Sequence, residues 1–268
     1  MKIYPSYEAE PEPVFTPLTE KLYSEFYSME MDGFEDDINF YNRLLPTKCS
    51  ILELGCGTGR IASKISSKER NVVGVDISLH RLKKAEEKML PYSRFICMDI
   101  RQLAFTSLFD QILIPYNTIN LLVEKNQIIS CLKECSSTLA GSGRLYLQLY
   151  IPDRTITSHK RSTFQFQMFD RVDGGKIIKE ILKNYSAETA TISIEERYRV
   201  RPMQPGLANQ DWNHIYSIAA FSYGEWLSIF KHSGFRQIKS YGGFDLTPFD
   251  EKHSSSLLAV LETIPRDK

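Results

Sequence analysis

The segment ILELGCGTGR, residues 51–60, constrains the fold more than any other part of the chain. A short apolar run ends at Leu54 and is followed by three glycines within five positions. Glycine permits a tight turn and lets a ligand approach the backbone closely, and a helix that follows offers free N–H groups at its N-terminus. The segment therefore predicts a strand, a ligand-binding glycine turn and a helix.

Strand and helix signals alternate along the chain after this point. Short apolar strands are expected at 50–54, 71–75, 94–98, 109–114, 143–150, 236–241 and 255–261. Apolar residues recur at helical spacing between several of them. Alternating strands and helices are typical of a parallel sheet with helices on both faces. We therefore expect an α/β fold with a doubly wound, mostly parallel, seven-stranded Rossmann-like sheet.

A different pattern occupies residues 152–221. Strand signals at 164–170, 176–185, 191–200 and 212–220 are separated by turn signals, and no helix need intervene. This pattern predicts an antiparallel β-ribbon inserted into the α/β domain. Three regions are expected: an N-terminal arm with helices (1–45), the main domain (46–151 and 222–268) and the inserted ribbon (152–221).

The composition argues against polyanionic and membrane partners. The 268 residues include 33 basic and 33 acidic side chains, so no net positive field favours nucleic acid. No run of about 18 apolar residues occurs, and the acidic, proline-interrupted N-terminus lacks the apolar core of a signal peptide. The five cysteines contain no CxxC pair and are expected to be reduced thiols. We expect a cytoplasmic protein with no metal site and no nucleic-acid or membrane partner; the oligomeric state stays open.

Three acids, Glu53, Asp76 and Asp99, stand at or near the ends of successive expected strands. Asp76 follows Gly55 by 21 residues, the separation at which an acid can accept hydrogen bonds from ribose hydroxyls. Asp99 ends the next strand, at the same carboxyl edge, and suits an adenine amino group. Ile77 and Ile100 would pack against the faces of that ring. The acids predict a nucleoside site at this edge of the sheet.

The glycine turn differs from the dinucleotide pattern. Its string is G-x-G-x-G with Arg60 in sixth place, whereas a dinucleotide site has G-x-G-x-x-G. An arginine there would obstruct close helix–strand packing in a dinucleotide fold. Glu53 stands at the mouth of the turn, and an acid suits the ammonium and sulfonium of S-adenosylmethionine better than it suits a pyrophosphate.

Several motifs together resemble the class I S-adenosylmethionine-dependent methyltransferases. They are ELGCGTGR (53–60), GVDIS (74–78), CMDIR (97–101), FDQILIPYNTINLL (109–122), AGSGRLYLQL (140–149) and HSGF (232–235). The likeness covers roughly residues 45–150 and 222–262. It implies S-adenosyl-L-methionine as cofactor and S-adenosyl-L-homocysteine as product, and we expect methyl transfer by direct displacement to nitrogen or oxygen of a small-molecule acceptor.

The resemblance also implies roles for particular residues. Glu53 would order the turn, Asp76 would hold the ribose and Asp99 the adenine, with the N-terminal helices over the cofactor. The residues expected at the cofactor are Glu53, Gly55, Cys56, Gly57, Gly59, Arg60, Asp76, Ile77, Arg81, Asp99, Ile100, Ile114, Pro115 and Tyr116.

The acceptor is expected above the carboxyl edge, under the inserted ribbon. Trp212, His214 and Tyr216 alternate and so share one face of a strand, where His214 could take a proton near neutral pH. The catalytic candidates are His214, Tyr116 and Asn117, and the acceptor-binding candidates are Tyr23, Tyr27, Asn120, Trp212, His214 and Tyr216. A surface strand with an ordinary histidine, and tyrosines that only pack in the core, are open alternatives.

Other functions stay open at this point. Ile114-Pro115-Tyr116-Asn117 is similar to a motif of methyltransferases that act on amines of bases or glutamine, but it has one proline and lacks the leading polar residue. A cofactor-binding subunit that serves a protein partner is a second alternative. A nicotinamide oxidoreductase is a third, disfavoured by Arg60 and Glu53.

Overall fold

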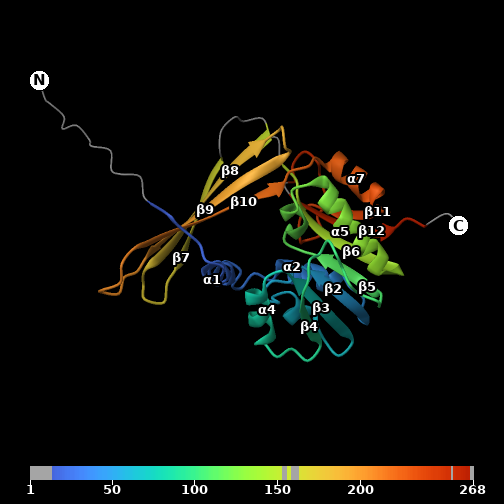
Figure 1. Ribbon diagram of the computed structural model, residues 1–268, viewed down its shortest axis with the longest axis horizontal. Helices are drawn as coiled ribbons and strands as arrows, with labels where there is room; N and C mark the ends of the chain where they lie inside the picture. The colour runs from blue at the N-terminus through green and yellow to red at the C-terminus, as the bar shows by residue number, and fades with distance from the viewer. Residues whose placement is uncertain (1–13, 153–155, 158–162, 255, 266–268) are drawn as a thin grey trace, which may run out of the picture.

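The computed structural model describes residues 14–152, 156–157, 163–254 and 256–265, and contains two sheets (Figure 1). The larger sheet has the order β11-β12-β6-β5-β2-β3-β4. Its strands are β2 (Cys49–Leu54), β3 (Arg70–Asp76), β4 (Ser93–Cys97), β5 (Phe109–Ile114), β6 (Leu139–Tyr150), β11 (Phe235–Tyr241) and β12 (Ser256–Thr263). Strand β12 runs antiparallel to both its neighbours, and the other described pairings of this sheet are parallel. This confirms the expected α/β fold class.

Helices cover both faces of this sheet. They are α2 (Asp36–Leu44), α3 (Ala62–Ile65), α4 (Leu79–Glu86), α5 (Lys125–Thr138), α7 (Tyr223–His232) and the 3-10 helix η1 (Thr118–Leu121). Leu52 of β2 belongs to the core with Trp226 of α7, whereas the next residue toward the N-terminus, Ile51, packs in the core with Tyr41 of α2. A central strand buried on both faces is what a parallel sheet requires. Along the described part of the chain, no helix is long and apolar enough to cross a membrane.

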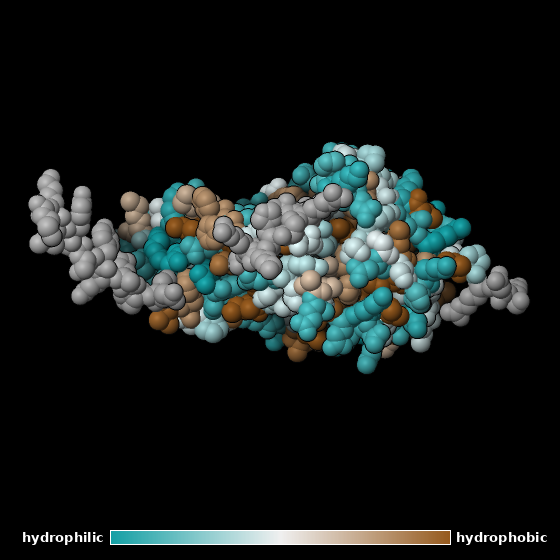
Figure 2. Space-filling model, turned by 90° about the horizontal axis from the view of Figure 1, so that it is seen from above, coloured by the Kyte–Doolittle hydropathy of each residue, from teal (hydrophilic) through white to brown (hydrophobic). Residues whose placement is uncertain are grey.

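The second sheet, which we call the lid, extends away from the main domain (Figure 1). Its order is β1-β10-β9-β8-β7, formed by β1 (Thr16–Pro17), β7 (Thr163–Asp170), β8 (Lys176–Ser186), β9 (Thr191–Arg201) and β10 (Gln210–Ala219). The four antiparallel strands match the expected ribbon. The fifth strand, β1, comes from the N-terminal arm and pairs in parallel with β10. Hydrophilic and apolar residues are intermixed over the face shown in Figure 2.

Helix α1 (Glu20–Glu30) and Asn120 link the lid to the main domain. Asn120 is fully buried, and its amide Nδ2 donates to the carbonyls of Tyr150 at 3.2 Å and Ala219 at 2.8 Å. Its Oδ1 accepts from the Tyr150 amide at 3.2 Å. This side chain therefore fastens the end of β6 to the end of β10, and the expected contact between Asn120 and an acceptor stays a prediction.

Replacing Asn120 by alanine should destabilise the fold by about 2–4 kcal/mol, because it removes three hydrogen bonds and leaves buried backbone groups without a partner. Urea unfolding would measure the loss. Asn126→Ala, at an exposed position of α5, is the matched control and should leave the free energy of unfolding unchanged. Equal stability of the two variants would contradict the structural role of Asn120.

Candidate functional site

The three glycines of the turn all have positive φ but face different surroundings. Gly55, Gly57 and Gly59 have φ values of +74°, +54° and +68°. A Cβ on Gly55 would collide with Thr118, and one on Gly59 would lie 2.8 Å from the Phe95 ring. A Cβ on Gly57 would meet nothing within 4 Å. Gly57 is thus the position where a ligand can approach the backbone, whereas Gly55 and Gly59 allow close packing.

Asp76 ties the turn to the following helix. Its Oδ2 accepts from the Gly57 amide and its Oδ1 from the Ser78 amide, both at 2.9 Å. The side chain of Ser78 in turn caps α4 by accepting from Arg81 N. Each carboxylate oxygen has a second lone pair for a further donor. The proposed ribose contact therefore stays a prediction.

Glu53 is a buried acid with an unused oxygen. It is 1% exposed, and its Oε2 has no hydrogen-bond partner. Burial raises the pKa of Glu53 to about 8, so the carboxyl is largely neutral at pH 7. A nearby cation would favour its ionised form, and the ammonium and sulfonium of S-adenosylmethionine carry such charge.

Arg60 is paired with an acidic side chain of the same protein. Its guanidinium forms an ion pair with the buried Asp37 of α2 and also donates to the Phe34 carbonyl at 3.1 Å. The arginine thus fastens the turn region to α2. It also lines the cleft beside the turn, so a contact with the cofactor stays a prediction.

A cleft of about 100 Å³ lies beside the glycine turn. Its lining includes Glu53, residues 55–58, Tyr27, Arg81, Pro115 and Tyr116. An acid with one unpartnered oxygen and an open glycine backbone fit the amino-acid end of S-adenosylmethionine. The volume of the cleft is large enough for only part of that molecule.

Of the residues expected around adenosine, Arg81 lines this cleft, whereas Asp76, Asp99, Ile77 and Ile100 do not. Asp76 and Asp99 follow neighbouring strands at the same carboxyl edge. Asp99 binds the Arg101 guanidinium, which holds the pKa of that carboxyl below its usual range, and Ile77 is 72% exposed. Ile114 is fully buried in the core and Ile100 packs partly against it. The nucleoside half of the site therefore remains a prediction.

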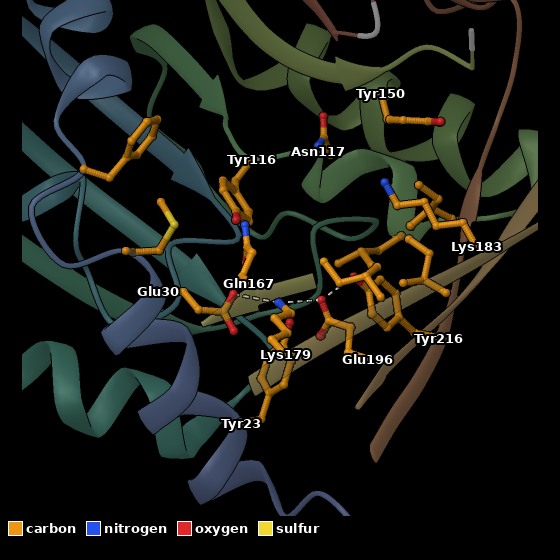
Figure 3. Close-up of a pocket in the computed structure, with 16 residues that line it drawn as sticks. Tyr23, Glu30, Tyr116, Asn117, Tyr150, Gln167, Lys179, Lys183, Glu196 and Tyr216 are labelled. Atoms are coloured by element: carbon orange, nitrogen blue, oxygen red, sulfur yellow. Dashed lines mark hydrogen bonds and ion pairs between the residues drawn. The ribbon is translucent and has the colours of Figure 1, made fainter. Parts of the chain in front are cut away.

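A second cavity, of about 490 Å³, lies between the cleft and the lid (Figure 3). Both cavities share Tyr23, Tyr116 and Leu121 as lining residues. Tyr116 and Asn117 have φ values of 54° and 57°, which is strained backbone for residues other than glycine. The Oδ1 of Asn117 is buried without a hydrogen-bond partner. Unpartnered groups and stored strain are typical of ligand-binding sites.

The aromatic residues expected at the acceptor come together only in part. The His214 ring lies 4.5 Å from that of Tyr23 and 5.0 Å from that of Tyr216, between centroids. Tyr27 meets Tyr116 edge to face at 5.5 Å. Trp212 packs with the cluster of Phe26 and Tyr198. Neither Trp212 nor His214 is among the residues that line the two cavities.

Four charged residues of the larger cavity were not predicted. Glu30, Lys179, Lys183 and Glu196 lie at its wall (Figure 3). A signal was present, since Glu196 interrupts the alternating apolar residues Ile192, Ile194, Tyr198 and Val200 on one face of β9. An acid on a buried strand face needs a partner or a ligand. Across the described residues, no group of three His, Cys, Asp or Glu side chains could hold a metal ion.

Wild type should lose stability as the pH rises from about 5 to 8, and Glu53→Gln should not show this loss. The raised pKa means that the folded protein keeps a proton that the unfolded chain releases in this window. Stability from this group is fully present below the unfolded pKa of 4.5 and is lost as the pH rises through about 8. The loss amounts to at most about 5 kcal/mol.

Urea unfolding across this pH range would measure the difference between wild type and Glu53→Gln. Glu69→Gln, at an exposed position, is the control and should keep the wild-type pH dependence. Parallel curves for wild type and Glu53→Gln would show that Glu53 is not the titrating group.

Comparisons with known proteins found similar sequences and similar structures. A family model described as "Methyltransferase domain" matches residues 51–143. "Putative methyltransferase YqeM" of Bacillus subtilis (strain 168) is 31% identical over 126 residues, which are 46% of this chain and 51% of that protein. The chain thus spans about half the length of this curated relative.

Two solved structures are similar over nearly the whole chain. CalS10, an amino pentose methyltransferase from Micromonospora echinaspora in its S-adenosylmethionine-bound form, has a TM-score of 0.71 and 18% identity, covering 93% of this chain and 100% of its own. The sugar N-methyltransferase KedS8 from Streptoalloteichus sp ATCC 53650 has a TM-score of 0.74 and 13% identity, covering 96% and 98%. At these identities the likeness shows the fold. Residues 51–143 are thus similar to a methyltransferase domain, and the whole chain has the fold of these two methyltransferase structures.

Proposed function

We propose that this protein transfers a methyl group from S-adenosylmethionine to a nitrogen or oxygen atom of a small molecule. One observation carries the proposal: the cleft at the glycine turn and the larger cavity under the lid share Tyr23, Tyr116 and Leu121. A donor in the first and an acceptor in the second would meet at this shared wall. Direct displacement needs such alignment and the exclusion of water rather than a covalent intermediate.

The larger cavity supports a small-molecule acceptor. Its volume of about 490 Å³ lies within the range of small-molecule sites, roughly 300–1,000 Å³. Helix α1 and strands β8, β9 and β10 of the lid form its walls, so we assign the lid the acceptor-binding role. The printed names of CalS10 and KedS8, which act on amino pentose or sugar nitrogen, support a compact polar acceptor.

The chain's own residues would supply positioning and proton transfer. Tyr116 and Asn117 line the cavity, and we assign them the role of orienting the acceptor. His214 has a buried Nδ1 without a hydrogen-bond partner, 3.9 Å from Oε2 of Glu196. It can accept the proton that an acceptor loses.

Calorimetric titration tests the donor half of the proposal. We expect affinities of about micromolar order for S-adenosylmethionine and S-adenosylhomocysteine, and no binding of NAD. Asp76→Ala should weaken both by about tenfold or more, because hydrogen bonds to a charged group contribute roughly 1.5–3 kcal/mol each. Asp110→Ala is the control, since Asp110 binds Ser50 at the opposite end of the sheet.

The outcomes of this titration separate the candidate functions. NAD binding alone would favour the oxidoreductase. Binding of the sulfur nucleosides without methyl transfer to any acceptor would favour a cofactor-binding subunit. An unchanged affinity in Asp76→Ala would refute the proposed register of the cofactor site.

Replacing His214 by alanine should lower kcat by at least about tenfold, as expected for loss of a proton acceptor, and leave the affinity for S-adenosylmethionine unchanged. Steady-state kinetics across pH would measure this once an acceptor is found. Equal rates at every pH would exclude His214 from the reaction.

A further inference from the structure

A buried cluster of three charges forms one wall of the larger cavity. Lys179 Nζ lies 2.7 Å from Oε2 of Glu30 and 2.8 Å from Oε1 of Glu196 (Figure 3). The three side chains are 6%, 11% and 8% exposed, respectively. They come from β8, from the end of α1 and from β9. Two carboxylates thus share one ammonium, so this cluster carries a net charge of −1; Lys183 is a second ammonium on the lining of the same cavity.

The neighbours of this cluster are mostly hydroxyl groups. Tyr198 donates to Oε1 of Glu30 at 2.7 Å, and Tyr216 donates to Oε1 of Glu196 at 3.4 Å. Burial raises the pKa of Tyr198 and Tyr216, so both phenols are neutral donors. Neutral donors satisfy hydrogen bonds but leave the excess negative charge in place.

The other charged and titratable groups described around Glu196 lie farther from its carboxylate than Lys179 does. His214 on β10 lies 3.9 Å away, and Lys183 on β8 lies over the ring of Tyr150, also on this cavity. Glu195 and Arg197 pair with each other on the opposite face of β9. Burial by itself raises the pKa of Glu196, but His214 and Lys179 hold it below the usual range, so Glu196 is ionised.

A buried unbalanced carboxylate is costly unless a cation approaches it. A protonated amine offers both a positive charge and several N–H donors, whereas an alcohol offers one neutral donor. The rings of Tyr23 and Tyr216 lie beside the cluster and line the same cavity, and aromatic faces also attract cations. Tyr23 is in addition part of the wall shared with the cofactor cleft. A cation bound here would therefore lie close to the expected point of methyl transfer.

We propose that Glu196, held by Lys179, binds the ammonium group of the acceptor and selects amines over alcohols. This rests on the proposed function and deepens it. The ammonium first loses one proton, which passes by way of Glu196 and His214 to solvent. The nitrogen lone pair then forms the new N–C bond while the C–S bond of the donor breaks with its electron pair on sulfur. Glu196 next stabilises the methylated ammonium product.

The test compares Glu196→Gln with Glu195→Gln. The two acids are adjacent on β9 but lie on opposite faces, so the second variant is a control for loss of charge outside the cavity. The probes are glucosamine, galactosamine and 3-amino-3-deoxyglucose, each paired with the sugar that carries a hydroxyl at the same position. Release of S-adenosylhomocysteine gives kcat and KM, and calorimetry on the S-adenosylhomocysteine complex gives acceptor affinity.

Wild type should bind and methylate amines in preference to their alcohol partners. Glu196→Gln should raise the KM for the amine by about ten- to a hundredfold, the effect of losing a charge-assisted hydrogen bond. Its affinity for S-adenosylmethionine should stay within twofold of wild type. Glu195→Gln should have the wild-type KM for the amine and the wild-type affinity for S-adenosylmethionine. Glu30→Gln removes the second carboxylate and should also raise KM, which decides the matter if Glu196→Gln fails to fold.

Three results would overturn the inference: a preference for alcohols, an unchanged amine KM in Glu196→Gln and in Glu30→Gln, or a wild-type protein that binds S-adenosylmethionine but none of the amines. Each of these leaves the donor half of the proposed function standing. Failure of the proposed function looks different, because wild type would then bind neither sulfur nucleoside.

Discussion

Helix α1 is held at both ends, and both cavities depend on that attachment. Near its start, Glu20 contacts Ser78, and the Arg81 guanidinium lies 5.0 Å from the centroid of the Tyr23 ring. At its end, Glu30 meets Lys179 of the lid. One short helix therefore spans the main domain and the lid and gives a wall to each cavity. Its position decides whether a donor and an acceptor can meet.

The other side of the shared wall is held in strained backbone. Tyr116 and Asn117 have positive φ, and the amide of Tyr116 is fixed by Gln148 Oε1 at 2.8 Å. Close by, Glu53 is buried with an unused oxygen. Strain and unsatisfied polar atoms lower the stability of the ligand-free protein, and they persist where the surrounding fold over-determines them. A ligand that supplies the missing partners would recover part of that stability.

Much of the sheet could be predicted because its signals are local. Strand β5 has the expected bounds, 109–114. Residue roles were harder to predict. Gly59 and Arg60 belong to the motif, yet one packs against Phe95 and the other pairs with Asp37. A motif gives the spacing of residues along the chain, whereas the partner of a side chain depends on what the rest of the fold brings to it.

The sequence by itself determined the parallel sheet, the glycine turn and the row of acids at its carboxyl edge, because hydrophobic periodicity and glycine conformations act over a few residues. Only the tertiary structure decided the wall of the larger cavity. Glu30 and Lys179 are 149 positions apart and meet because the lid folds back over α1. Neither Glu30 nor Lys179 is marked as a site residue by the sequence of its own segment. Their shared burial, and the excess charge that follows from it, exists only once the two segments pack together.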